Sequence, residues 1–152
     1  MKPRLLIAED DPGAGEALRT AFDADGYEVE VAETGSEARE LWRKGGWDAV
    51  LTDVVMPDVD GLTLLREFVA TEGAPPVVVM TAYGSIERAV QAMKDGAYDF
   101  LEKPLDLANL RAVVKSALEA RGSEDANRAA RRAAPADGRV LLPGDSARMR
   151  KV

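Results

Sequence analysis

The 152-residue chain contains neither cysteine nor histidine. Without cysteine it has no disulfide, thiolate nucleophile or zinc–thiolate cluster. Without histidine it has no Ser–His–Asp triad, HExxH metal site or phosphohistidine of its own. No apolar run approaches the roughly 20 residues of a membrane span. The first apolar run ends at the charged residue Glu9 and is therefore too short to be a signal peptide. We therefore expect a cytoplasmic protein without a membrane segment.

Charge is distributed unevenly along the chain. Residues 1–120 hold 12 Lys and Arg against 23 Asp and Glu, whereas residues 121–152 hold 8 against 4. An acidic surface repels the phosphate backbone of nucleic acids. We therefore expect no direct nucleic-acid binding by residues 1–121, and a cation or a protein as the partner of this part.

Short apolar runs alternate with segments of helical periodicity. The expected strands are Arg4–Ala8, Glu28–Ala32, Ala49–Thr52, Val77–Met80 and Tyr98–Glu102. The expected helices are Gly15–Ala24, one from an N-cap at Ser36 to the stop at Gly45-Gly46, Leu62–Thr71, Ser85–Asp95, and a last one capped by Asp106. Strict alternation predicts an α/β fold, a doubly wound five-stranded parallel sheet with helices on both faces.

Residues with charged or hydroxyl side chains lie at the ends of the expected strands. These residues are Glu9, Asp10 and Asp11, then Asp53, Thr81 and Lys103. In a doubly wound sheet such ends converge on one edge, where clustered carboxylates repel each other unless a cation neutralises them. An all-oxygen site with few ligands suits Mg²⁺. A carboxylate, a metal, a hydroxyl and an ammonium group are the components that stabilise phosphoryl transfer.

Each of these residues also has a simpler interpretation when taken alone. Asp10 or Asp11 could cap the first helix, with Pro12 in its first turn. Asp53 could be a turn residue, Thr81 a strand residue, and Lys103 a solvated surface charge. Their joint occurrence at the strand ends, in this order, favours a shared site.

These residues closely resemble the receiver domain of two-component response regulators. The motifs that carry the resemblance are Glu9-Asp10, Asp53 with Pro57 and Gly61, Thr81-Ala82, and Lys103-Pro104. The resemblance covers residues 3 to about 121. It implies a flavodoxin-like sheet of order 2-1-3-4-5 with five helices. It also implies a sensor histidine kinase as partner and a homodimer through the fourth helix, fifth strand and fifth helix.

The same resemblance implies a role for each site residue. Asp53 would be the phosphoacceptor, and the direct Mg²⁺ ligands would be Asp10, Asp53 and the Val55 carbonyl. Glu9 would hold the metal through water, and Asp11 matches a position that is often acidic. Thr81 and Lys103 would contact the phosphoryl oxygens, and Phe100 would be the aromatic switch residue. The family usually has a cis Lys–Pro bond at the place of Lys103-Pro104. Val55 and Tyr83 would line the approach of water to Asp53, which predicts slow loss of the phosphoryl group.

The C-terminal residues differ from the rest in composition. Residues 122–139 are rich in alanine and arginine, which indicates a linker or an extension of the last helix, with dimer contacts as an alternative. In residues 140–152, the pattern of Gly144, Ser146, Met149 and Val152 resembles the opening of the ATPase domain of nitrogen-regulator-type activators of sigma-54 transcription. We therefore expect a receiver domain over residues 1–121 and the start of a truncated ATPase domain at 140–152.

Two other functions are compatible with parts of the pattern. A magnesium-dependent phosphatase with an aspartate nucleophile would use a similar carboxylate, but such enzymes usually have a D-x-D pair and Asp53 is followed by Val54-Val55. A docking module that is never phosphorylated would keep the fold alone, which the intact set of polar residues argues against. We therefore expect a phosphoacceptor signalling domain rather than an enzyme with turnover.

Overall fold

The computed structural model describes residues 2–82 and 86–133, and side chains over 2–82 and 86–121. Tyr83 and the expected ATPase-like segment 140–152 lie outside the described residues. The first compact unit of the chain is Met1–Leu118. The fold described below is that of this unit.

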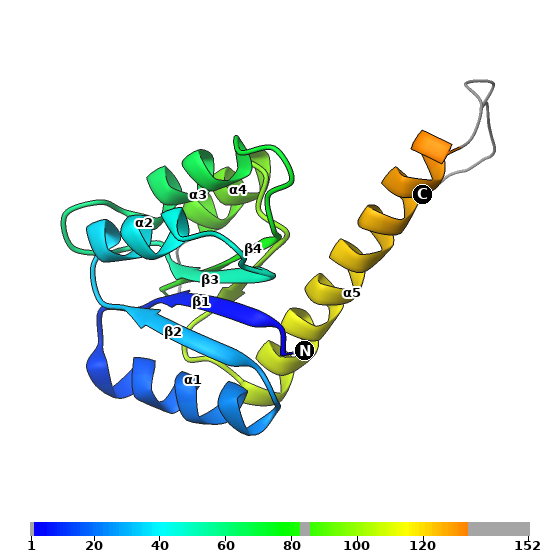
Figure 1. Ribbon diagram of the computed structural model, residues 1–152. Coiled ribbons are helices and arrows are strands. Elements are labelled where there is room, and N and C mark those ends of the chain that lie inside the picture. The colour runs from blue at the N-terminus through cyan, green and yellow to red at the C-terminus, as the bar shows by residue number, and fades with distance from the viewer. Residues whose placement is uncertain (1, 83–85, 134–152) are drawn as a thin grey trace. The chain divides into compact units, whose positions relative to one another are not determined.

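The five strands form one parallel sheet, as the alternation predicted (Figure 1). The strands are β1 (Arg4–Ala8), β2 (Glu28–Ala32), β3 (Ala49–Asp53), β4 (Val77–Thr81) and β5 (Asp99–Glu102). Their order is β2-β1-β3-β4-β5, which confirms the expected arrangement. The order in which the chain adds strands therefore reverses between β1 and β3, the position at which doubly wound folds bind ligands.

Five helices cover the two faces of the sheet (Figure 1). They are α1 (Pro12–Ala24), α2 (Gly35–Arg43), α3 (Gly61–Val69), α4 (Ile86–Lys94) and α5 (Leu107–Ala133). The buried side chains form two clusters. One joins α1 and the first part of α5 to the sheet, and the other joins α2, α3 and α4 to the opposite face. Among the described residues, no helix is long and apolar enough to cross a membrane.

The strands divide their side chains between these two clusters. In β1, Leu5 and Ile7 belong to the α1–α5 cluster, whereas Leu6 and Ala8 belong to the other cluster. Every residue of β3 and of β4 is buried. Central strands covered on both faces have no solvent side, which explains the continuous apolar run at Val77.

Helix starts are where the structure departs most from the sequence-based expectation. Helix α1 begins at Pro12 rather than Gly15, because the Asp11 side chain accepts a hydrogen bond from Gly13 N at 3.1 Å and caps it. Proline is well suited to the first helical position because its fixed φ is helical and no partner is needed for its nitrogen. Asp11 therefore has the simpler of its two interpretations, that of an N-cap.

Ser36 as the N-cap of α2 was a wrong expectation. The cap is Thr34, whose Oγ1 accepts from Glu37 N at 3.0 Å, while the Glu37 carboxylate accepts from Glu33 N at 2.8 Å. This reciprocal pairing resembles a capping box and satisfies two backbone donors at once. Ser36 N instead donates to Asp58 Oδ1 at 3.2 Å, a contact from a distant loop.

Strands β1 and β2 have the expected bounds, and those of β3, β4, β5 and α3 differ by one or two residues. Asp53 and Thr81 are the last residues of β3 and β4 rather than the first residues after them. The expected Asp106 cap is confirmed, because its Oδ1 accepts from Ala108 N at 3.0 Å. Helix α5 continues to Ala133, so residues 122–133 are helical.

The aromatic pair of Trp42 and Phe68 provides a test of the packing between α2 and α3. The two rings stack with centroids 4.1 Å apart, and Phe68 is 1% exposed. We expect Phe68→Ala to lower the free energy of unfolding by about 3–5 kcal/mol through lost burial and a cavity. Phe100→Ala is the matched control, because Phe100 is 38% exposed, and it should cost under about 1 kcal/mol. Urea unfolding followed by circular dichroism measures both, and equal losses would contradict this account of the core.

Candidate functional site

Three carboxylates meet at the carboxyl edge of the sheet. Glu9 and Asp10 directly follow β1, and Asp53 ends the neighbouring strand β3. Each of the three offers one oxygen, and these oxygens all lie within 4.8 Å of one another. Glu9 and Asp53 are buried, at 1% and 6% exposure, whereas Asp10 is exposed. The site thus has two buried carboxylates with a third at its mouth.

Lys103 lies between the two buried carboxylates. Its Nζ donates to Asp53 Oδ2 at 2.6 Å and to Glu9 Oε1 at 2.9 Å. Its backbone N donates to Thr81 O at 2.8 Å, which ties the loop after β5 to the end of β4. Burial alone would lower the pKa of Lys103, but the hydrogen bonds and charges of Asp53 and Glu9 together raise it above its ordinary value. The ammonium group is therefore held charged at the centre of the site.

Glu9 is buried without leaving its oxygens unsatisfied. Oε1 accepts from Lys103, and Oε2 accepts from the backbone N of Asp11 at 3.1 Å. Asp11 is not a member of the carboxylate cluster, since its side chain caps α1. Its backbone nevertheless orients Glu9, a role that the sequence did not indicate.

The side chains of Thr81, Val55 and Phe100 differ in their exposure to solvent. Thr81 is fully buried, and its Oγ1 donates to Leu101 O at 3.5 Å. Val55 follows Asp53 by two residues and is 54% exposed, so its side chain is open to solvent. Phe100 lies partly exposed on β5. The Lys103–Pro104 peptide bond is cis, as the resemblance implied.

Gly61 allows the loop between β3 and α3 to return close to Asp53. The backbone N of Gly61 donates to Val54 O at 2.7 Å. A Cβ at Gly61 would lie 1.9 Å from the Asp53 carbonyl oxygen, closer than real atoms approach. Any larger residue would therefore push the loop away from the strand end that carries Asp53.

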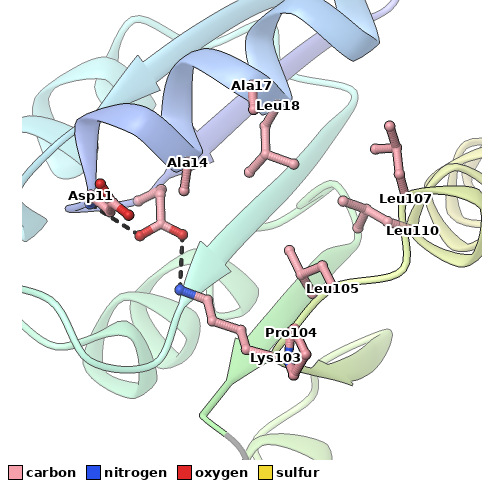
Figure 2. A pocket seen from close by; sticks show the side chains of 10 residues that line it. Asp11, Ala14, Ala17, Leu18, Lys103, Pro104, Leu105, Leu107 and Leu110 are labelled. Carbon is pink, nitrogen blue, oxygen red and sulfur yellow. Dashed lines mark hydrogen bonds and ion pairs between the residues drawn. The ribbon is translucent and has the colours of Figure 1, made fainter.

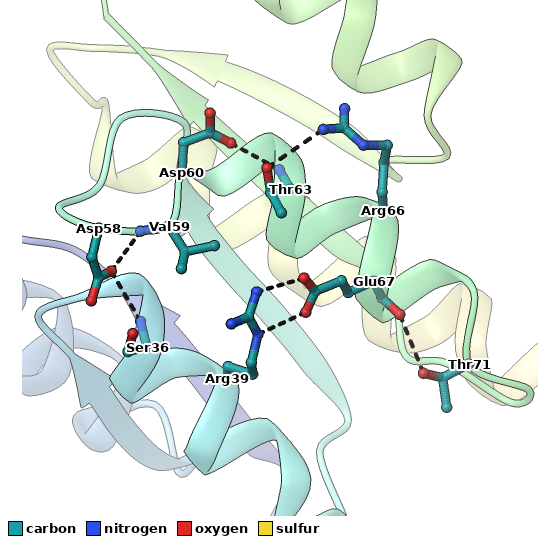
Figure 3. Close-up of polar contacts among 9 residues, drawn as sticks. All are labelled: Ser36, Arg39, Asp58, Val59, Asp60, Thr63, Arg66, Glu67 and Thr71. Atoms are coloured by element: carbon teal, nitrogen blue, oxygen red, sulfur yellow. Dashed lines mark hydrogen bonds and ion pairs between the residues drawn. The ribbon is translucent and has the colours of Figure 1, made fainter.

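The outer part of the same loop contacts the start of α2, and no local sequence pattern indicated this contact (Figure 3). Asp58 accepts from Ser36 N, and Pro57 O accepts from Gly35 N at 3.2 Å. Asp58 has φ 64°, the one positive φ of a non-glycine residue among those the structure describes. Aspartate adopts this conformation more readily than most residues, which was the one available signal.

A cavity of about 360 Å³ adjoins the site between α1 and the start of α5 (Figure 2). Its apolar walls include Ala14, Leu18, Leu105 and Leu110, and Lys103 is among the residues at its polar side. The cavity offers an apolar surface next to the buried carboxylates.

The donor set fits a divalent cation. Three carboxylates and one ammonium group leave two uncompensated negative charges within a few ångströms. All candidate ligands are oxygens, and the exposed position of Asp10 leaves room for water, which Mg²⁺ retains in protein sites. The same cluster brings the Asp53 carboxylate to within 2.6 Å of the Lys103 ammonium group. A carboxylate can act as a nucleophile, and an ammonium group can stabilise phosphoryl oxygens.

Comparison with known proteins agrees with this geometry. Residues 5–115 match the family model of the response regulator receiver domain. The chain is 43% identical over 122 residues to the transcriptional regulatory protein ZraR of Escherichia coli K12, covering 80% of this chain and 28% of that protein. It is 38% identical over 149 residues to the response regulator protein PilR of Pseudomonas aeruginosa, covering 98% of this chain and 32% of that protein. The chain thus spans about a third or less of these curated relatives.

Solved structures show the same fold. A structure of NtrX from Brucella abortus is similar with a TM-score of 0.78 at 28% identity, covering 84% of this chain and 29% of that chain. The non-phosphorylated HemR receiver domain from Leptospira biflexa is similar with a TM-score of 0.71 at 34% identity, covering 77% of this chain and 94% of that chain. In fold, in the order of its motifs and in sequence, the chain belongs to the response regulator receiver domain family.

Proposed function

We propose that this chain accepts a phosphoryl group on Asp53 from a partner sensor histidine kinase and then changes conformation to control transcription. One observation carries the proposal: the Asp53 carboxylate ends β3 beside Glu9 and Asp10 and is 2.6 Å from Lys103 Nζ. Asp53 Oδ would attack phosphorus and form an acyl phosphate, while the P–N bond to the kinase's histidine breaks and the histidine nitrogen keeps the electron pair. The chain would be a phosphoacceptor without further substrate turnover.

The residues around Asp53 would each act on the incoming group. Lys103 already points at Asp53 Oδ2 and would pair with a phosphoryl oxygen on that carboxylate. Thr81 ends the neighbouring strand, and its hydroxyl would turn from Leu101 O to donate to another phosphoryl oxygen. The exposed Val55 offers no group that could orient a water for hydrolysis, which supports slow loss of the phosphoryl group.

We propose Mg²⁺ as the cation of the site. Asp10, Asp53 and the Val55 carbonyl would bind it directly, and Glu9 would hold it through water. When bound, Mg²⁺ neutralises the carboxylates and the charge that develops on the phosphoryl oxygens. Glu9 keeps its hydrogen bonds to Lys103 and Asp11 N, which support a role outside the direct ligand set.

We propose that the change at Thr81 reaches Phe100 and a homodimer face made by α4, β5 and α5. The exposed apolar residues Ile86, Val90 and Met93 follow one another at helical spacing on α4. Phe100 on β5 and Leu107 at the start of α5 are exposed as well. Such apolar side chains on neighbouring elements are typical of an interaction surface.

The kinase would dock near α1 and the loop after β5. The cavity between these elements presents apolar side chains directly beside the phosphoacceptor site. A helix of the partner could place its own apolar residues there while its phosphohistidine faces Asp53. This arrangement would couple partner recognition to the approach of the phosphoryl group.

We propose that the chain is part of a longer sigma-54 activator of the nitrogen-regulator type in the cytoplasm. The receiver would be residues 1–121, followed by a helical connection over 122–139 and the start of an ATPase domain at 140–152. The similarity to PilR, which spans 98% of the chain, supports this because it continues past the receiver. Residues 1–121 would not bind nucleic acid, since their surface is acidic.

The phosphoacceptor assignment is tested by Asp53→Asn in labelling with acetyl phosphate and magnesium. We expect wild type to incorporate about one phosphoryl group per chain and Asp53→Asn to incorporate none, because the amide is a far weaker nucleophile. Asp60→Asn is the matched control, since asparagine can replace Asp60 as the N-cap of α3. Phosphoprotein mass spectrometry gives the stoichiometry. Continuous phosphate release would indicate a phosphatase instead, and an unlabelled wild type would indicate a docking module.

The metal assignment is tested by comparing Asp10→Asn with Asp11→Asn. Asp10 belongs to the carboxylate cluster, whereas the neighbouring Asp11 caps α1. We expect Asp10→Asn to weaken Mg²⁺ binding by tenfold or more, because a direct ligand loses its charge, on the order of effects seen for metal-site residues. Asp11→Asn should bind Mg²⁺ as wild type does, since asparagine caps equally well. Amide chemical shifts during a magnesium titration measure both, and equal affinities of all three proteins would refute the assignment.

The dimer face is tested by Val90→Glu. We expect the variant to be labelled normally but to remain a monomer after phosphorylation, because a charge would be buried in the interface. Thr20→Glu places the same charge on an exposed position of α1 and serves as the control. Light scattering with and without phosphodonor gives the mass of each protein. A phosphorylated Val90→Glu dimer as stable as that of wild type would place the interface elsewhere.

A further inference from the structure

The loop between β3 and α3 is held at two places, and only one of them is close to Asp53. The first is Gly61, whose backbone lies against the Asp53 carbonyl. The second lies at the outer end of the loop, where Pro57 and Asp58 meet the start of α2. Val55, whose carbonyl is among the proposed metal ligands, lies between the end of β3 at Asp53 and the second of these places.

The joint with α2 has three components, of which Figure 3 shows the hydrogen bonds to Asp58. Asp58 Oδ1 accepts from Ser36 N at 3.2 Å and also from its own neighbour, Val59 N. Pro57 O accepts from Gly35 N at 3.2 Å. A Cβ at Gly35 would lie 2.1 Å from Val59 O and 2.6 Å from Val59 Cβ, so the approach of helix and loop requires a glycine.

Asp58 is held in its position by conformation as well as by contacts. Its φ of 64° places it in the left-handed region, which is unfavourable for a residue with a side chain unless that side chain is satisfied locally. Hydrogen bonds from Ser36 and Val59 lower the pKa of the Asp58 carboxyl, consistent with an ionised acceptor at a helix start. The Thr34 side chain caps the same helix on its own, so α2 does not depend on Asp58 alone for its cap.

We propose that Asp58 is a positioning residue: together with Gly35 it anchors the β3–α3 loop on α2 and thereby holds Val55 beside Asp53 for metal binding. This inference rests on the proposed function, because it assigns a cause to the geometry of the same site. The anchor acts through the backbone and does not touch the metal or the phosphoryl group. The start of α2 thus becomes part of what determines Mg²⁺ affinity.

The test distinguishes the effect of the hydrogen-bond acceptor on the Asp58 side chain from the effect of the positive backbone φ at this position. Asp58→Gly keeps access to the positive φ but removes the acceptor, and Asp58→Asn keeps both. We expect Asp58→Gly to bind Mg²⁺ about tenfold more weakly than wild type, as partners outside the direct ligand set typically do when removed. Asp58→Asn should restore wild-type affinity. Gly35→Ala changes the α2 side of the joint and forces the helix and the loop apart. It should therefore weaken Mg²⁺ binding as Asp58→Gly does.

Thr34→Ala is the matched control for stability. It removes the cap of the same helix but leaves the contact with the loop in place. We expect it to lower the melting temperature about as much as Asp58→Gly does while leaving the Mg²⁺ dissociation constant unchanged. Magnesium titrations followed by amide chemical shifts, with melts of every variant by circular dichroism, provide both quantities. The full 152-residue chain is used throughout.

The outcomes distinguish this inference from the function on which it rests. Suppose that wild type binds Mg²⁺ and is labelled on Asp53. If Asp58→Gly then binds Mg²⁺ as tightly as wild type does, the anchor is overturned and the proposed function stands. Equal weakening in Thr34→Ala would also overturn it, because loss of the helix start alone would then explain the effect. A wild type that neither binds Mg²⁺ nor is labelled would overturn the proposed function, and the anchor with it.

Discussion

The ion pairs of Lys103 with Glu9 and Asp53 are the interaction on which the site depends. Two buried carboxylates at neighbouring strand ends would repel each other strongly, and the cost of burying each charge is several kcal/mol unless it is paired. Lys103 pairs with both carboxylates through one ammonium group, and its own backbone is tied to the end of β4. Because Asp10 adds a third carboxylate to the cluster, one ammonium group leaves it with a net negative formal charge, which attracts a divalent cation. The fold therefore keeps the Asp53 carboxylate buried and paired with Lys103 without any ligand.

Close backbone approaches determine the position of that carboxylate. Gly61 lies against the Asp53 carbonyl, and Gly35 lies against Val59 at the outer end of the same loop. Both contacts exclude a side chain, so the loop has little freedom to shift relative to β3 and α2. Rigid positioning of this kind is what a phosphoryl acceptor needs, because the reacting oxygen must be aligned before the partner binds.

The sequence predicted the elements and the gathering of polar residues at the strand ends because both follow from short-range patterns. Alternating apolar runs and helical stripes indicated the five strands and five helices, and the ends of those strands carried Asp53, Thr81 and Lys103. Which residue caps a helix was less predictable. Thr34 and Ser36 are both good caps by residue type, and the choice depended on the pairing between Glu33 and Glu37. The contact of Asp58 with Ser36 joins residues 22 positions apart, so no local pattern could indicate it.

The site assignment is tested most directly by finding the atom that receives the phosphoryl group. An acyl phosphate on aspartate is reduced by borohydride to homoserine, which marks the modified residue permanently. After labelling with acetyl phosphate and magnesium, peptide mapping should find homoserine at position 53 and at no other aspartate. A mark at Asp10 or at a surface aspartate, with position 53 unchanged, would contradict the account.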